Sequence, residues 1–182
     1  GIRHGVILSS AFVFGATSSE GDYAKVKAEN DWTVGQVALY PDRLVAFCGI
    51  NPLQPYGVAE VRRCAKLTGV KGIKIHSAND RIDLRKPEHV ASLRRVFEAA
   101  NAAGLHITIH LATEEGLHDP TAAAEQVKAF LSGVLPAATR IQVQVAHVYA
   151  DRGWGPEVDG VFEQFVTAIR TKAPGTRSLV FD

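Results

Sequence analysis

Three histidines each stand at the end of a short apolar segment of the chain. GIKIH ends at His76, ITIH ends at His110 and VQVAH ends at His147. Imidazole is a common ligand of divalent metals and exchanges protons near neutral pH. Because the side chains of a strand alternate between two faces, Lys74 shares a face with His76. These segments therefore predict strand ends that present polar side chains for binding a metal ion or a substrate.

The segment 105–111 separates its two kinds of side chain cleanly. His106, Thr108 and His110 share one face, and four aliphatic residues share the other. A strand that packs helices on its aliphatic face leaves the other face for function near its carboxyl end. His110 is therefore predicted to be functional, whereas His106, which lies deeper in the strand, is predicted to be structural.

The segment 140–147 follows a different phase. His147 falls on the face of two valines, and Gln142 and Gln144 take the opposite face. Either a bulge near Ala146 resets the alternation, or the two glutamines find partners beneath a helix. The sequence leaves both alternatives open.

Strand-like and helix-like segments alternate along the whole chain. Such strict alternation is typical of parallel βαβ units. Both an open doubly wound sheet and a (βα)8 barrel contain these units, at about 30 residues each here, and a complete barrel needs about 250 residues. The predicted strands are 5–15, 44–50, 72–76, 105–111, 140–147 and 178–182, and the predicted helices are 22–40, 57–67, 87–104, 120–135 and 155–173.

The segment with which the first predicted strand continues bears on the choice between these two architectures. It reads SSAFVFGATSSEGD and contains neither a G-x-G-x-x-G motif nor a P-loop, so it gives no support to a nucleotide-binding open sheet. Histidines that end successive strands favour a metal site at the carboxyl ends of barrel strands. We therefore predict a single α/β domain over residues 1–182, built as a partial TIM-type barrel.

The bulk composition excludes several classes of partner. A formal net charge of +1 gives no reason to expect nucleic acid or an anionic membrane as a partner, and no segment reaches the ~18 apolar residues that span a bilayer. Cys48 and Cys64 form no C-x-x-C pair, so they are predicted to be reduced, buried residues of a cytoplasmic protein. A small-molecule substrate is the expected partner, and the sequence leaves homo-oligomerisation open.

Several runs of the chain resemble the amidohydrolase superfamily, and more narrowly its amidohydrolase-related group of metal-dependent hydrolases and decarboxylases. The runs are VILSSAFVFG, AKVKAENDW, VALYPDRLVAFCGINPL, GVKGIKIH, DLRKPEHVASLRRVFEAANAAGLHITIH and IQVQVAH. The resemblance implies a TIM barrel with a divalent metal ion, expected to be zinc, at the carboxyl ends of its strands. On this reading the six predicted strands correspond to barrel strands two to seven. The chain lacks the H-x-H pair of the first strand, the Asp of the eighth and any Met, so truncation at both ends is expected.

The resemblance also implies a role for each residue that matches a family position. His110 matches the fifth-strand metal ligand. His147 matches the sixth-strand His, which is a second ligand in binuclear members and the catalytic acid or base in many mononuclear ones. Lys74 and His76 match fourth-strand positions that face the substrate. A carboxylated Lys74 that bridges two metal ions would require a binuclear site and is the less favoured alternative.

The loop DRIDLRKPEH, residues 80–89, follows the fourth barrel strand, and such loops build the active sites of barrels. Arg85 could therefore clamp a substrate carboxylate. The alternative, in which Asp83 or Arg85 organises the entry into the next helix, is the preferred interpretation.

Together these residues predict a metal-dependent hydrolase that attacks a small carbonyl or carboxylate substrate with metal-activated water. A metal-dependent decarboxylase of an aromatic or enol acid is the alternative, with His147 protonating the carbon from which CO2 leaves. A third reading, of another class, is a barrel fragment that is catalytically incomplete.

Overall fold

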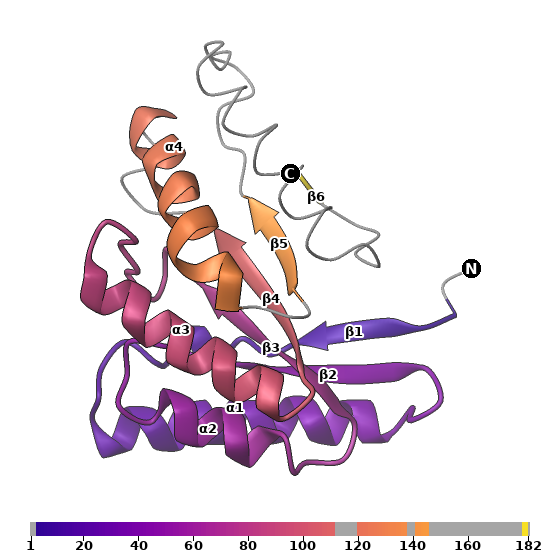
Figure 1. Ribbon diagram of the computed structural model, residues 1–182. Coiled ribbons are helices and arrows are strands. Elements are labelled where there is room, and N and C mark those ends of the chain that lie inside the picture. The colour runs from indigo at the N-terminus through magenta and orange to yellow at the C-terminus, as the bar shows by residue number, and fades with distance from the viewer. Residues whose placement is uncertain (1–2, 112–119, 138–140, 146–179, 182) are drawn as a thin grey trace.

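The computed structural model describes residues 3–111, 120–137, 141–145 and 180–181, and shows helices arranged around a curved sheet (Figure 1). The strands are β1 (Gly5–Leu8), β2 (Leu44–Gly49), β3 (Val70–His76), β4 (His106–Leu111), β5 (Ile141–Val145) and β6 (Val180–Phe181). The helices are α1 (Glu20–Ala38), α2 (Gly57–Cys64), α3 (Pro87–Ala102) and α4 (Pro120–Ala129). The predicted helix 155–173 lies outside the described residues.

All six strands are parallel, and their order in the sheet is β1-β2-β3-β4-β5-β6. A doubly wound sheet reverses its strand order at a switch point, and this sheet does not, so the open-sheet alternative is excluded. The curved sheet with its outer helices is a partial TIM-type barrel, as the sequence predicted.

The sheet has one aliphatic face and one polar face. Ile73, Ile75, Ile107 and Ile109 are fully buried in the main hydrophobic core. The β3–β4 pairing aligns Lys74 with Thr108 and His76 with His110, on the opposite face. Burial of the four isoleucines stabilises the fold by roughly 1.5–3 kcal/mol each. This burial also fixes the register, because a slip of one residue would turn the isoleucines away from the helices.

The first strand is shorter than predicted, ending at Leu8 rather than near Gly15. The Ser9 N–H still donates to the Phe47 carbonyl, and the chain then enters a 3₁₀ turn, η1 (Ala11–Val13). η1 lies against Gly49, where an added Cβ would come 2.9 Å from the Ala11 Cβ. Glycine at the end of β2 therefore allows this turn to fold across the polar face of the sheet.

The prediction of reduced cysteines was wrong. Cys48 and Cys64 are buried, as expected, but they form a disulfide. Cys48 lies on the helix-packed face of β2 and Cys64 ends α2, so that their Cα atoms are 6.5 Å apart, a usual spacing for a disulfide. The bond links α2 directly to the strand beneath it.

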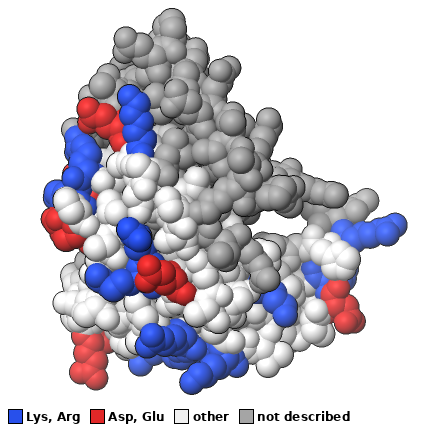
Figure 2. Space-filling view, viewed as in Figure 1, with Lys and Arg blue, Asp and Glu red and all other residues white. Residues whose placement is uncertain are grey.

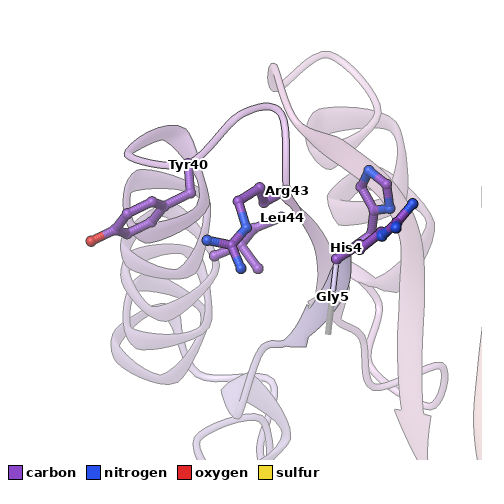
Figure 3. A pocket seen from close by; sticks show the side chains of 6 residues that line it. His4, Gly5, Tyr40, Arg43 and Leu44 are labelled. Carbon is purple, nitrogen blue, oxygen red and sulfur yellow. The ribbon is translucent and has the colours of Figure 1, made fainter. Parts of the chain in front are cut away.

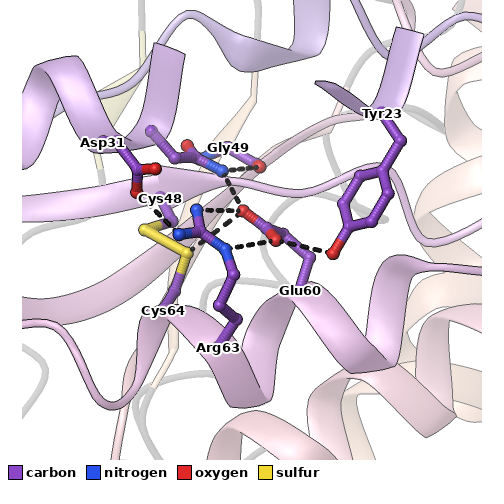
Figure 4. Close-up of polar contacts among 8 residues, drawn as sticks. Tyr23, Asp31, Cys48, Gly49, Glu60, Arg63 and Cys64 are labelled. Atoms are coloured by element: carbon purple, nitrogen blue, oxygen red, sulfur yellow. Dashed lines mark hydrogen bonds and ion pairs between the residues drawn. A yellow bond between two sulfur atoms is a disulfide. The ribbon is translucent and has the colours of Figure 1, made fainter. Parts of the chain in front are cut away.

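A buried polar network ties α1 and α2 to the carboxyl end of β2 (Figure 4). The fully buried carboxylate of Glu60 accepts hydrogen bonds from Asn30 Nδ2 at 2.8 Å and Tyr23 Oη at 3.1 Å, and from two nitrogens of Arg63 at 2.8 Å each. Asn30 also accepts from the Gly49 N–H at 2.8 Å and donates to the Gly49 carbonyl at 3.2 Å. The side chain of Asn30 thus pairs with strand β2 just beyond the point where β1 ends.

Candidate functional site

The imidazoles of His76 and His110 meet at the carboxyl ends of two paired strands. His110 Nδ1 lies 2.8 Å from His76 Nε2, and the rings are arranged edge to face at 76°. Both side chains are only half-buried, so the pair is reachable from solvent. The structure therefore brings together two of the three histidines that the sequence singled out, on the face of the sheet predicted for them.

The turn that follows β3 holds this histidine pair in place. Ser77 donates its backbone N–H at 3.0 Å and its hydroxyl at 2.8 Å to the carbonyl of His110. The Asn79 N–H points to His76 Nδ1 at 3.4 Å, a long contact for a hydrogen bond. The ends of β3 and β4 are thereby locked to one another, whereas the ring of His76 is held more loosely.

Phe12, from the loop after β1, covers one side of the pair. Its ring stacks on the ring of His76, with centroids 4.8 Å apart and planes 26° from parallel. Sequence analysis missed this residue because it placed Phe12 inside a longer first strand. The early end of β1 at Leu8 and the turn over Gly49 bring Phe12 to the site.

Lys74 lies two residues before His76 on the same face, with only 5% of its surface exposed. None of the described residues forms an ion pair or hydrogen bond with it, and burial lowers the pKa of its ammonium to about 8. Burial, followed by the positive charges of His110 and Lys74, lowers the pKa of His76 to about 4. At neutral pH the site therefore combines a neutral His76 with a largely protonated Lys74 that no described residue pairs with, an arrangement that favours an anionic ligand.

A second buried group, Asp80, lies in the turn after β3 and was missed by the sequence analysis. Neither carboxylate oxygen of Asp80 has a hydrogen-bond partner in the described part of the chain, and burial raises its pKa well above the usual value. The buried hydroxyl of Tyr56 also has no hydrogen-bond partner among the described residues. Burial raises the pKa of Tyr56 to about 12, and Asp80 is among the acidic neighbours that contribute. Nothing in the spacing of DRIDL signals that the turn buries its acid.

The remaining predicted residues have mixed outcomes. His147 lies outside the described residues. The β4–β5 register aligns positions 142 and 144 with Thr108 and His110. His106 is exposed and stacks on Phe47, away from the pair, and its predicted structural role stays a prediction.

Arg85 is bound to the carboxylate of Asp83, which also accepts the Arg85 N–H at 3.0 Å. Gln126 of α4 donates to the same carboxylate at 2.8 Å. This arrangement matches the interpretation in which Asp83 and Arg85 organise the entry into α3, rather than the one in which Arg85 clamps a substrate.

The metal that the family resemblance implies fits the described residues in part. Two imidazoles at a strand end are suitable ligands for a divalent ion. Within the described ranges, however, no three His, Cys, Asp or Glu side chains gather closely enough to hold one. His76 and His110 can therefore supply two ligands, and a complete site needs further ligands from other residues.

Other surface features lie away from the histidine pair. A pocket of about 250 Å³ at the amino ends of β1 and β2 is lined by His4, Tyr40, Arg43 and Leu44, among others (Figure 3). It is at the opposite edge of the sheet from the carboxyl ends that carry the histidines. On the face seen in Figure 2, basic and acidic side chains are interspersed, and no described helix is long and apolar enough to cross a membrane.

The curved parallel sheet makes the protein an α/β barrel of the TIM type, and such barrels place their sites at the carboxyl ends of the strands, where the histidine pair lies. The sequence model of one such family, described as Amidohydrolase, matches residues 2–170. The chain therefore belongs to the amidohydrolase family. No curated protein matches it closely enough to be counted as a relative.

Solved structures with the same fold include several decarboxylases. The 5-carboxyvanillate decarboxylase of Sphingomonas paucimobilis has a TM-score of 0.62 at 19% identity, over 91% of this chain and 53% of its own. That of Novosphingobium aromaticivorans, in complex with manganese and 4-hydroxy-3-methoxy-5-nitrobenzoic acid, has a TM-score of 0.60 at 21% identity, over 100% of this chain and 55% of its own. The apo IDCase of Metarhizium anisopliae has a TM-score of 0.57 at 19% identity, over 98% and 52%. The chain thus spans about half the length of the solved structures that it matches.

Proposed function

We propose that the protein is a metal-dependent decarboxylase that releases CO2 from an aromatic or enol acid. The observation that carries this proposal is the buried ammonium of Lys74, which has no acidic partner among the described residues, on the same face as the His76–His110 pair. A buried cation without an acidic partner is costly unless it binds an anion, and a carboxylate substrate supplies one. Two solved structures of the same fold support the carbon–carbon lyase reading, because both are named 5-carboxyvanillate decarboxylases.

In this proposal each residue has a separate task. His110 helps to hold a divalent ion, which when bound supplies Lewis-acid stabilisation of negative charge on a substrate oxygen. Lys74 binds the substrate anion, and because Lys74 is buried, most water is excluded from the place where the two charges meet. His147 is predicted to deliver a proton to the ring or enol carbon after the bond between that carbon and the carboxylate breaks and CO2 leaves.

Hydrolysis by metal-activated water, the first prediction from the sequence, is the rival within the same family. Hydrolysis would use a metal ion and a proton-transfer residue at the same positions, so the two reactions can be distinguished only by measuring which product forms. Zinc likewise stays a prediction, and the ion bound in the Novosphingobium enzyme makes manganese the second ion to test.

The experiment is a paired activity screen of the full chain loaded with Mn²⁺ or Zn²⁺. Hydroxybenzoic acids with a carboxylate beside the hydroxyl are assayed for CO2 release, and esters and lactones are assayed for acid release. We expect metal-dependent CO2 release and no hydrolysis. Hydrolysis of an ester or lactone without CO2 release from any acid would overturn the proposal. Asp83→Asn is a control variant that leaves the histidine pair and Lys74 untouched.

A further inference from the structure

The turn after β1 places one large apolar side chain at the polar face of the sheet. Phe12 stacks on His76, with ring centroids 4.8 Å apart. Its neighbour Ala11 is buried in a small core with Val26 and Tyr56, whereas Phe12 is half-buried and belongs to neither hydrophobic core of the described residues. The core packing of the fold therefore does not account for a phenylalanine at this position.

Hydrogen bonds hold this turn in place at both ends. Before the turn, the Ser9 N–H donates to the Phe47 carbonyl at 2.9 Å. After it, the side-chain nitrogen of Asn51 donates to the Gly15 carbonyl at 2.8 Å. Phe12 is thus presented by a turn that is ordered before any ligand binds, which lowers the entropic cost of using its ring for recognition.

The same turn folds over the strand position next to Lys74. The β2–β3 register pairs Lys74 with Gly49, and the Phe12 backbone nitrogen lies 3.3 Å from the place that a Cβ on Gly49 would occupy. His76 follows Lys74 on the same face, and two residues of a parallel strand span about 6.6 Å, roughly the length of a benzoate ion. An aromatic acid whose carboxylate binds Lys74 can therefore reach the Phe12–His76 stack with its ring.

We infer that Phe12 is a specificity-determining residue, whose ring packs against the ring of an aromatic acid held by Lys74. This role rests on the proposed function, because it takes the substrate to be an acid bound at Lys74, and it selects an aromatic acid over an enol acid. Neighbouring aromatic rings attract each other in offset-stacked or edge-to-face contacts, beyond the effect of the area that they bury. An enol acid without a ring lacks this contact and gains less from Phe12.

Two acids of the same charge test this contact by equilibrium binding. Benzoate and cyclohexanecarboxylate both carry a six-membered ring, but only benzoate is aromatic, and neither has the hydroxyl of the acids in the activity screen. In a calorimetric titration, the full chain loaded with Zn²⁺ should bind benzoate about 3–10-fold more tightly than cyclohexanecarboxylate. Phe12→Leu should lower this ratio of affinities to about 1, and Phe12→Tyr, which keeps the ring, should retain the preference for benzoate.

Phe14→Leu is the matched control. Phe14 lies two residues after Phe12, is exposed, and makes no ring contact with another described residue. This variant should bind both acids as the unaltered protein does. A loss of the preference for benzoate in Phe14→Leu as large as that in Phe12→Leu would refute the specific role of Phe12.

The outcomes separate the role of Phe12 from the proposed function. If the unaltered protein binds the two acids equally, or if Phe12→Leu keeps the preference for benzoate, the role of Phe12 is refuted, and the proposed function stands provided that Lys74→Met weakens the binding of both acids. If the unaltered protein binds neither acid, or if Lys74→Met binds both as the unaltered protein does, Lys74 does not hold the acid and both proposals fail.

A measurement on the unaltered chain covers the case in which Phe12→Leu does not fold. With Zn²⁺, which is diamagnetic, and benzoate at a saturating concentration, NMR should show nuclear Overhauser effects between the ring protons of benzoate and those of Phe12. The absence of these effects, or effects to other phenylalanine rings alone, would overturn the role of Phe12.

Discussion

Replacing Asn30 by alanine should destabilise the protein more than any other truncation of a single polar side chain on α1. Asn30 is fully buried. Its side-chain oxygen accepts a hydrogen bond from the Gly49 N–H at 2.8 Å, and its side-chain nitrogen donates to the Gly49 carbonyl at 3.2 Å and to Glu60 Oε1 at 2.8 Å. Alanine cannot replace any of these bonds, and the space that it leaves is closed off from bulk water by α1, α2 and β2.

The size of the effect follows from the groups left without partners. Each buried polar group that loses its only partner costs about 1–3 kcal/mol, and the variant strands both backbone groups of Gly49. Glu60 keeps its bonds to Arg63 and Tyr23, so its loss is smaller. We expect the free energy of unfolding to fall by about 3–5 kcal/mol, which at a urea m-value of about 2 kcal/mol per M lowers the midpoint by roughly 2 M.

Equilibrium urea unfolding followed by circular dichroism measures this change. Glu29→Ala is the matched control, since Glu29 is the adjacent residue of α1 and, among the described residues, accepts a single exposed hydrogen bond, from Ser10. The effect of this control on the free energy of unfolding should stay below about 0.5 kcal/mol. A loss of less than about 1 kcal/mol for Asn30→Ala would refute the reasoning, because the Gly49 groups would then have found other partners.

Three further predictions concern the residues around the site. Asp80→Asn should stabilise the protein at neutral pH, because the folded state of the parent holds a proton on Asp80 that the unfolded chain has released. The stability of the parent therefore falls by up to about 1.4 kcal/mol per pH unit as the pH rises from about 4 toward the raised pKa of Asp80. Thermal melts from pH 4 to 8 that differ by a constant amount between variant and parent would contradict this. Lys74→Met should raise the free energy of unfolding by about 2 kcal/mol, because it removes a buried ammonium that has no acidic partner among the described residues. It should also raise the KM for an acidic substrate at least 10-fold, and an unchanged KM would remove Lys74 from the substrate site. Gly49→Ala should lower the free energy of unfolding in urea by about 1–3 kcal/mol, because the added Cβ would press on Ala11 and displace the turn that carries Phe12. An unchanged free energy of unfolding would mean that the turn adapts freely.

The sequence predicted the polar face of the sheet because strand phase is a local property. Alternation alone places Lys74 and His76 opposite buried isoleucines, and the parallel βα rhythm brings the end of β3 beside the end of β4. Residue types and spacing therefore predicted that His76 and His110 lie at strand ends on the same face of the sheet.

The features that the sequence did not predict depend on where loops turn and how helices pack. Cys48 and Cys64 are 16 residues apart with no motif between them, and only the packing of α2 on β2 brings them together. Phe12 reaches His76 because β1 ends early over Gly49, and Asp80 is buried by the turn that follows β3. The choice between decarboxylation and hydrolysis depends on substrate and proton positions that strand phase does not encode.

The most direct test of the metal site is the metal content of the purified full chain and its His110→Ala and His106→Ala variants, measured by elemental analysis after growth with added Mn²⁺ and Zn²⁺. We predict about one divalent ion per chain in the parent and in His106→Ala, and close to none in His110→Ala. An equal metal content in all three proteins would contradict the assignment of His110 and with it the proposed function.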